Sequence, residues 1–201
     1  MYSMSENYSV LILAGGNSSR MQAPKPWLPF EKNTFLEHII DVYSECGLKN
    51  ITVVLNEAFA GGIWEKKVES IKRNAIIVKN NKVEKGRLYS IKLGLNNMKK
   101  TKYVYIHNVD NPFISESVIE LLSLNASSVG VCIPSYRGRK GHPVLISDKI
   151  IEAVLKNNNY NITLRDILNG FPQKKVIVNT DSILYNINTP SDLKMSMSEY
   201  L

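Results

Sequence analysis

Short apolar segments rich in β-branched residues alternate along the chain with longer segments of helical periodicity. The apolar segments cover residues 8–14, 51–55, 75–78 and 103–107, and the helical segments between them cover 34–45, 64–71 and 88–97. Such alternation is typical of βα units that build a mainly parallel sheet. We therefore predict an α/β, Rossmann-like fold with helices on both faces of the central sheet.

The second half of the chain continues the alternation less regularly. Helical periodicity predicts helices over residues 115–124, 148–155 and 163–168, and a final helix that begins at Thr189 and Pro190. Apolar runs predict strands at residues 129–134 and 144–146 and near 176–178 and 183–185. No linker, low-complexity tract or internal repeat interrupts the sequence, so we predict one domain over residues 1–201.

The charge balance narrows the classes of partner. Lys and Arg total 25 against 18 Asp and Glu, a net charge of +7, which favours phosphorylated small molecules, nucleic acid or an acidic membrane surface. The cations gather near residues 15–25 and 137–140 without interleaved aromatic residues, which argues against nucleic acid as the partner.

The sequence shows no sign of a zinc site or a membrane segment. The two cysteines have no zinc-site spacing, and no apolar run approaches the about 20 residues of a membrane helix. With no signal peptide at its start, we expect a cytoplasmic protein without a membrane partner.

A glycine-rich loop follows the first predicted strand. The strand leads into Gly15, Gly16 and three small polar residues, so the backbone can turn tightly and present several N–H groups to one anion. Arg20 and Lys25 add positive charge at two points, as a triphosphate with a leaving pyrophosphate requires. Lys25 is flanked by prolines, so the loop is no Walker motif, and there is no G-x-G-x-x-G. We predict a triphosphate-binding loop; the alternative is a plain turn.

Asp110 follows the strand predicted at residues 103–107. In the common 3-2-1-4 order of a doubly wound sheet, the first and fourth strands are neighbours and end in the same crevice. Asp110 would then face the glycine-rich loop. A carboxylate beside a triphosphate repels it unless a cation intervenes, so the sequence predicts that Asp110 is a Mg²⁺ ligand. The alternative is an aspartate that caps the turn before Pro112.

Five segments carry a resemblance to a known family. They are Leu13-Ala14-Gly15-Gly16-x-Ser18-Ser19-Arg20-Met21-x3-Lys25, Gly86-Arg87-x-x-Ser90-Ile91-x-x-Gly94-Leu95, Asp110-x-Pro112, Gly141-His142-Pro143 and Asn186-x-Asn188-Thr189-Pro190-x-Asp192. Together they resemble the molybdenum cofactor nucleotidyltransferases, the guanylyl- and cytidylyltransferases of the glycosyltransferase-A-like nucleotidyltransferase superfamily. The resemblance extends from about Val10 to Leu193, nearly the whole chain.

This resemblance implies a Mg²⁺-dependent reaction. The terminal phosphate of molybdopterin would attack the α-phosphorus of CTP or GTP, and pyrophosphate would leave. Such a displacement asks the protein for positioning and charge neutralisation, and a phosphate monoester is already an anionic nucleophile that needs no general base. Within the one domain we expect the NTP-binding part at about residues 8–135 and an acceptor-side subregion at about 136–201. A molybdoenzyme is the implied recipient of the product.

The resemblance also assigns roles to individual residues. Arg20, Lys25 and Asp110 are the implied catalytic residues, and Asp110 would hold Mg²⁺ together with Asn186 and Asn188. The implied nucleotide-binding residues are Leu13, Ala14, Gly15, Gly16, Ser18, Ser19, Gly86 and Ser90. The implied acceptor-binding residues are His142, Arg139 and Arg165. A lone structural histidine is the alternative for His142, and an exposed salt bridge is the alternative for Arg165.

Some positions depart from the family pattern. Gln22 stands where the family often has glycine, and Asn186 and Asn188 stand where the cytidylyl branch usually has aspartates. Some motifs resemble the guanylyl branch and others the cytidylyl branch, so the base remains CTP or GTP. Two other functions stay open: a nucleotidyltransferase for another phosphorylated acceptor, such as a sugar phosphate or methylerythritol phosphate, and a non-catalytic nucleotide-binding partner of a molybdoenzyme.

Overall fold

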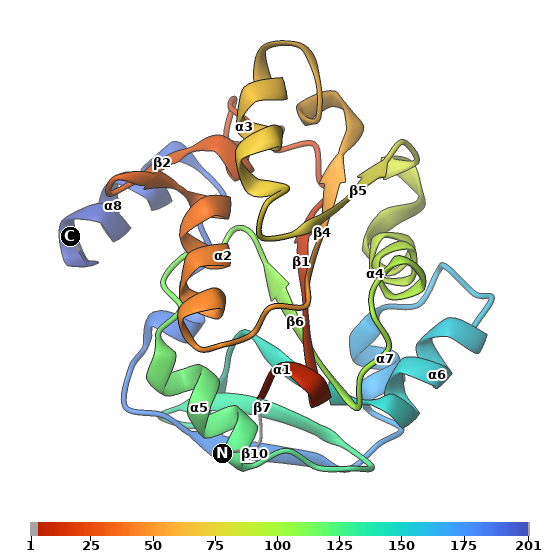
Figure 1. Cartoon of the computed structure of the whole chain (residues 1–201). Helices are drawn as coiled ribbons and strands as arrows, with labels where there is room; N and C mark the ends of the chain where they lie inside the picture. Colours follow the sequence, from red (N-terminus) through yellow and green to blue (C-terminus); the bar gives the residue numbers. More distant parts are fainter. Residues whose placement is uncertain (1–3, 201) are drawn as a thin grey trace.

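The central feature of the chain is a twisted sheet with helices on both faces, seen in a computed structural model that describes residues 4–200 (Figure 1). Within these residues the strand order is β10-β7-β9-β6-β1-β4-β5, and β8 pairs with β7. The bounds are β1 Tyr8–Ala14, β4 Ile51–Asn56, β5 Ile76–Asn80, β6 Tyr103–Asn108, β7 Val131–Tyr136, β8 Arg139–Lys140, β9 Val144–Ser147 and β10 Gln173–Ile177. A small antiparallel pair consists of β2 Pro29–Phe30 and β3 Asn33–Thr34.

The helices lie close to where the sequence periodicity predicts them. Their bounds are α1 Met4–Asn7, α2 Phe35–Glu45, α3 Glu65–Ile71, α4 Gly86–Asn97, α5 Glu116–Leu124, α6 Asp148–Lys156, α7 Leu164–Leu168 and α8 Pro190–Tyr200. Helix α2 begins with a capping box, in which the Thr34 hydroxyl accepts from the Glu37 N–H and the Glu37 carboxylate accepts from the Thr34 N–H. None of the helices in the described part of the chain is long and apolar enough to span a lipid bilayer.

Strand β1 lies at the centre of the parallel part of the sheet. It pairs in parallel with β4 and β6, and β4 pairs in parallel with β5, which gives the predicted order of the first four βα strands. Successive side chains of β1 point to opposite faces. Val10 and Ile12 join the core under α2 and α5, whereas Leu11 and Leu13 join the core under α4 and α6. The mainly parallel α/β fold is thereby confirmed.

The strand predicted near residues 183–185 is wrong. Ser182–Leu184 is a short 3₁₀ helix, because the Leu184 N–H donates to the Asp181 carbonyl at 2.8 Å and the Tyr185 N–H donates to the Ser182 carbonyl. Ile183 is 1% exposed and packs under Gly141, where an added Cβ would lie 2.4 Å from the Ile183 carbonyl oxygen. The apolar side chains of this run are therefore buried although their backbone forms a helical turn and does not pair with a strand.

Gly94 sets how closely α4 approaches the sheet. A Cβ added there would lie 2.3 Å from Leu11 Cδ1 and 2.8 Å from Val54 Cγ2, and both of these side chains are fully buried. Real Cβ atoms do not approach other atoms this closely, so any larger residue would push α4 away from β1 and β4. This close packing fixes where the first turn of α4 lies relative to the ends of these strands.

We expect Gly94→Val to lower the free energy of unfolding by roughly 2 kcal/mol or more, because it overpacks the helix–sheet contact. Asn96→Val is the matched control, since Asn96 is exposed on the same helix and its replacement should cost about 0.5 kcal/mol at most. Urea denaturation of the three proteins measures both effects. Equal midpoints for the two variants would contradict the packing argument.

Candidate active site

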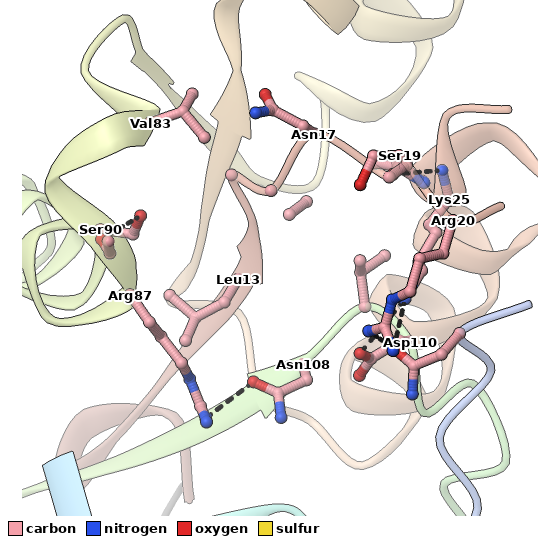
Figure 2. A pocket seen from close by; sticks show the side chains of 18 residues that line it. Leu13, Asn17, Ser19, Arg20, Lys25, Val83, Arg87, Ser90, Asn108 and Asp110 are labelled. Carbon is pink, nitrogen blue, oxygen red and sulfur yellow. Dashed lines mark hydrogen bonds and ion pairs between the residues drawn. The ribbon is translucent and has the colours of Figure 1, made fainter. Parts of the chain in front are cut away.

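A cavity of about 440 Å³ opens at the carboxyl ends of β1 and β6 (Figure 2). This is the edge of a parallel sheet where ligands of open α/β folds bind. The cavity brings together most of the residues that the sequence singles out, namely Leu13, Ala14, Gly15, Gly16, Ser18, Ser19, Arg20, Lys25, Gly86, Ser90, Asp110 and Asn188. Two segments far apart in the sequence therefore meet in one space, the loop after β1 and the turn after β6.

The loop after β1 is held in place by hydrogen bonds from neighbouring elements. The Asn56 side-chain amide donates to the Gly16 carbonyl at 3.3 Å and to Asn17 Oδ1 at 3.0 Å. The Lys25 N–H donates to Ser18 Oγ at 3.1 Å and closes the loop on itself. A Cβ on Gly15 would lie 3.1 Å from Ser90 Oγ, so glycine lets the loop pass close to α4. These contacts hold the loop in place along the cavity that it lines.

Gln22, the residue that stands where the family often has glycine, has φ +59°. A positive φ is the left-handed conformation that glycine adopts without steric cost and other residues adopt rarely. The backbone therefore keeps the turn that a glycine would favour, although the side chain is glutamine. The departure from the family pattern leaves the course of the loop between Met21 and Lys25 compatible with the cavity.

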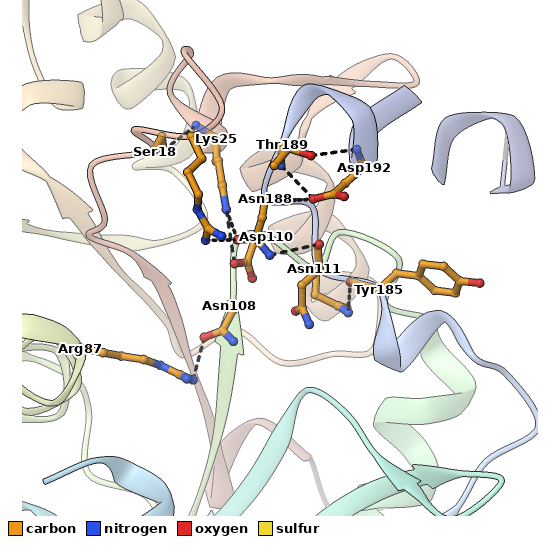
Figure 3. Close-up of polar contacts among 12 residues, drawn as sticks. Ser18, Lys25, Arg87, Asn108, Asp110, Asn111, Tyr185, Asn188, Thr189 and Asp192 are labelled. Atoms are coloured by element: carbon orange, nitrogen blue, oxygen red, sulfur yellow. Dashed lines mark hydrogen bonds and ion pairs between the residues drawn. The ribbon is translucent and has the colours of Figure 1, made fainter. Parts of the chain in front are cut away.

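Two cations converge on one amide oxygen at the mouth of the cavity. Asn188 Oδ1 accepts from Lys25 Nζ at 2.9 Å and from an Arg20 Nη at 3.0 Å (Figure 3). Lys25 Nζ also lies 3.5 Å from Asp110 Oδ2. The Lys25 side chain is only 12% exposed, so its ammonium group is directed into the site rather than into bulk solvent. An anion that enters the cavity would meet both positive charges.

Asp110 has one carboxylate oxygen ready for a cation. Its Oδ1 is buried and has no hydrogen-bond partner among the described residues, and such an oxygen suits a hard metal ion. Residues 4–200 contain no cluster of three His, Cys, Asp or Glu side chains, so a cation here would depend on Asp110, amide oxygens and the phosphates of a bound nucleotide. This donor set fits Mg²⁺, which prefers oxygen ligands and keeps substrate phosphates among them.

The two asparagines predicted as metal ligands are placed differently. Asn188 lines the same cavity as Asp110, but its Oδ1 already accepts from two cations. The Asn186 side chain is exposed and lines a second cavity of about 600 Å³ together with Arg139. The structure therefore brings Asn188 to Asp110 and does not bring the Asn186 side chain there.

A buried network holds the Asp110 turn against the segment that carries Asn188. The Asn111 side-chain amide donates to the carbonyls of Ser182 at 3.1 Å and Tyr185 at 2.6 Å (Figure 3). The Ile187 N–H donates to the Asp110 carbonyl at 2.7 Å. These bonds join residues 110–111 to residues 182–187 across the site. The position of Asn188 beside Asp110 follows from this connection.

His107 supports the same turn from within the core. Its Nε2 lies 2.8 Å from the Asn111 carbonyl, which can only accept, so Nε2 carries the proton. Its Nδ1 then accepts from the Tyr43 hydroxyl at 2.9 Å. Burial lowers the pKa of His107 to about 4, and the Asn111 carbonyl bond opposes that effect only in part. The imidazole is therefore neutral near pH 7 and acts as a fixed hydrogen-bonding bridge.

The residues predicted to contact the acceptor lie outside the cavity lining. Arg139 belongs to β8 and faces the second cavity, and Arg165 belongs to α7. His142 precedes a cis peptide bond to Pro143, and its Nδ1 is buried without a hydrogen-bond partner among the described residues. The pKa of His142 is lowered to about 4 by burial and then by the charges of Arg87 and Arg165. The positive charges of Arg87 and Arg165 therefore both disfavour protonation of His142.

Sequence reasoning missed several residues that shape the site. Asn56, Asn80 and Asn108 are the last residues of β4, β5 and β6, and their amides bond to the glycine-rich loop, to Ser90 and to Arg87 respectively. The sequence does carry a signal for them, because three of the parallel strands end in an asparagine at the edge of the sheet where the cavity lies. Arg87 also lines the cavity, and although it belongs to the family segment that begins at Gly86, the resemblance assigns it no role.

Comparisons with known proteins show the family of the chain. The model of the family described as "MobA-like NTP transferase domain" matches residues 10–176. The chain is 25% identical over 191 residues to the molybdenum cofactor cytidylyltransferase of Escherichia coli, which covers 94% of this chain and 95% of the relative. It is 27% identical over 199 residues to a probable molybdenum cofactor guanylyltransferase of Carboxydothermus hydrogenoformans, with 93% of each chain covered.

Solved structures share the fold over nearly the full length. A nucleotidyl transferase from Methanothermobacter superposes with a TM-score of 0.77 at 20% identity and covers 96% of this chain and 97% of its own. The 4-diphosphocytidyl-2C-methyl-D-erythritol synthase of Anaerococcus prevotii gives a TM-score of 0.73 at 16% identity, with 97% and 98% covered. At these identities the likeness is one of fold alone.

We expect the stability contributed by neutral His107 to be present above pH 6.5 and lost as the pH falls toward 4. The unfolded imidazole takes up a proton near pH 6.5, whereas the folded one takes it up near pH 4. Between pH 7.5 and 4.5 the wild type should therefore lose about 2 kcal/mol more unfolding free energy than His107→Gln. Urea denaturation at the two pH values measures this difference, and NMR titration of the His107 imidazole gives its pKa directly. Equal losses in both proteins would contradict the assignment.

Proposed function

Because the chain belongs to the MobA-like NTP transferase family, we propose that it transfers the nucleoside monophosphate of CTP or GTP to the terminal phosphate of molybdopterin and releases pyrophosphate. The chain is a nucleotidyltransferase, as its family and its relatives are. One observation carries the proposal for the site: the glycine-rich loop, Lys25 and Asp110 line a single cavity. Because the family is one of NTP transferases, it argues against the alternative function of a non-catalytic nucleotide-binding partner.

In this proposal the nucleotide spans the cavity. The backbone of Gly15, Gly16 and Ser18 faces the triphosphate, and Arg20 and Lys25 neutralise the oxygens of the leaving pyrophosphate. Gly86 and Ser90 lie at the other end of the cavity and approach the base. With the nucleotide in this orientation, the α-phosphorus would lie between Asn108 and Asp110, where the loop after β1 and the turn after β6 meet.

Asp110 is the residue that would hold Mg²⁺, through the buried oxygen that has no protein partner. The ion, when bound, supplies charge neutralisation between the carboxylate and the phosphates. Lys25, 3.5 Å from the other oxygen, holds the Asp110 carboxylate in this orientation. The protein's contribution is positioning and electrostatics, which suit a displacement at phosphorus.

Molybdopterin is the proposed acceptor because the curated relatives over nearly the whole chain are named for the molybdenum cofactor. A molybdoenzyme would then take up the product. A second acceptor has an observation in its favour, since the fold is shared with a protein named for methylerythritol chemistry. The triphosphate machinery would be the same in both cases, so residues of about 136–201 would make the choice.

The acceptor is tested by pyrophosphate release from each of the four NTPs with Mg²⁺ and one acceptor at a time: molybdopterin, methylerythritol phosphate or a sugar phosphate. We expect release with molybdopterin and with CTP or GTP. Release with methylerythritol phosphate or a sugar phosphate, and none with molybdopterin, would reject the proposed acceptor while keeping the nucleotidyltransferase.

We expect Asp110→Ala to lower turnover by at least about 10²-fold and to remove its dependence on Mg²⁺, because the carboxylate that would hold the ion is gone. The fold should persist, since the backbone bond from Ile187 to the Asp110 carbonyl is unchanged. Glu69→Ala, an exposed carboxylate on α3, is the control and should behave as wild type. Near-normal Mg²⁺-dependent turnover of Asp110→Ala would place the metal elsewhere.

We expect Lys25→Ala to lower turnover by on the order of 10²-fold, because charge that builds on the leaving pyrophosphate loses its buried partner. Lys72→Ala removes a half-exposed lysine outside the cavity and serves as the matched control. Steady-state kinetics with Mg²⁺ and saturating NTP measures the effect. If the lysine variants had equal rates, Lys25 would have no role in the displacement.

A further inference from the structure

Arg87 lies on the opposite side of the cavity from the two cations of the glycine-rich loop. It extends from the first turn of α4 to the end of β6, where a guanidinium N–H donates to Asn108 Oδ1 at 2.8 Å. Figure 2 shows Arg87 on one side of Asn108, and Lys25 and Arg20 beyond Asp110 on the other. The cavity therefore has a positive group at each side of its floor.

The charge of Arg87 is not matched by a close carboxylate. The ion pairs between described residues are Lys25–Asp110, Lys72–Glu69 and Lys156–Glu152, and none includes Arg87. Among the described residues its polar partner is the neutral amide of Asn108. Desolvation lowers the pKa of the Arg87 guanidinium, and the more distant Asp110 acts in the opposite direction. The Arg87 side chain is exposed where it lines the cavity, so a guanidinium with no ion-pair partner among the described residues can be reached by an incoming anion.

Arg87 also acts electrostatically on His142, which does not line the cavity. Arg165, from α7, and Arg87 both act on His142, whose pKa is lowered first by burial and then by these two charges. His142 is therefore neutral near pH 7, and its buried Nδ1 has no hydrogen-bond partner among the described residues. No carboxylate forms an ion pair with either arginine within residues 4–200.

The geometry of the reaction requires an anion on this side. In a displacement at phosphorus the attacking and leaving oxygens lie roughly in line, on opposite sides of the phosphorus. The leaving pyrophosphate is assigned above to Lys25 and Arg20. The attacking phosphate must then approach from the opposite side, across Asn108, where Arg87 lies.

We propose that Arg87 forms a second anion site that binds the phosphate monoester of the acceptor and holds it in line for attack. The planar fork of an arginine can bind two phosphate oxygens at once, which fixes direction as well as charge. The inference rests on the proposed function for the identity of the anion. The existence of the second anion site can be tested without molybdopterin.

The first experiment tests the site by binding. With Mg²⁺ and a saturating α,β-methylene NTP to fill the glycine-rich loop, inorganic phosphate is titrated into the protein and followed by calorimetry. We expect phosphate to bind the wild-type complex and to bind Arg87→Gln at least tenfold more weakly. Arg73→Gln, which removes an exposed arginine outside this cavity, should match wild type. Absence of phosphate binding to the wild-type complex, or equal weakening in both variants, would overturn the proposal.

The second experiment separates acceptor binding from nucleotide binding. In steady-state assays Arg87→Gln should raise KM for the phosphorylated acceptor at least tenfold and leave KM for the NTP unchanged, and Arg87→Lys should recover part of the loss. A parallel rise in both KM values would assign Arg87 to the nucleotide and overturn the inference. If phosphate binds through Arg87 but molybdopterin gives no turnover, the proposed acceptor fails and the anion site stands.

Discussion

Parallel pairing of β1 with β6 is the constraint on which the site depends. The register runs from Tyr8 opposite Tyr103 to Leu13 opposite Asn108, and the Val109 N–H continues it with a 3.1 Å bond to the Leu13 carbonyl. The chain segments that leave these two strands must therefore start side by side. A slip of one residue would exchange the faces of β1, so that side chains packed under α2 would move to α4. The buried alternation on both faces makes such a slip costly.

Asparagine amides do much of the positioning around the cavity. Asn56, Asn80 and Asn108 close three parallel strands, and Asn111 joins the turn after β6 to residues 182–185. An amide donates and accepts at once and carries no charge, so it can fix a loop without changing the electrostatic potential that an anionic ligand meets. The charged residues are then left for the ligand. Among residues 4–200, Lys25–Asp110 is the one ion pair found in the cavity.

Local signals in the sequence were sufficient for the framework and for part of the site. Strand and helix periodicity, the glycine-rich loop and the position of Asp110 all depend on neighbouring residues and on a common strand order. The 3₁₀ turn at Ser182–Leu184 and the different positions of Asn186 and Asn188 depend instead on hydrogen bonds from Asn111, about seventy positions away in the chain. The role of Arg87 likewise depends on which side of Asn108 it reaches, and no local pattern contains that information.

The amide of Asn188 bears on how Lys25 and Arg20 can meet a triphosphate. Lys25 and Arg20 both donate to Asn188 Oδ1 and so are aimed at one point. A carboxylate at that position would form ion pairs that an arriving triphosphate has to break, whereas a neutral oxygen yields to phosphate at little cost. The asparagine therefore keeps both cations aimed at one point through hydrogen bonds to a neutral oxygen. Phosphate oxygens, which are stronger acceptors, can replace these bonds.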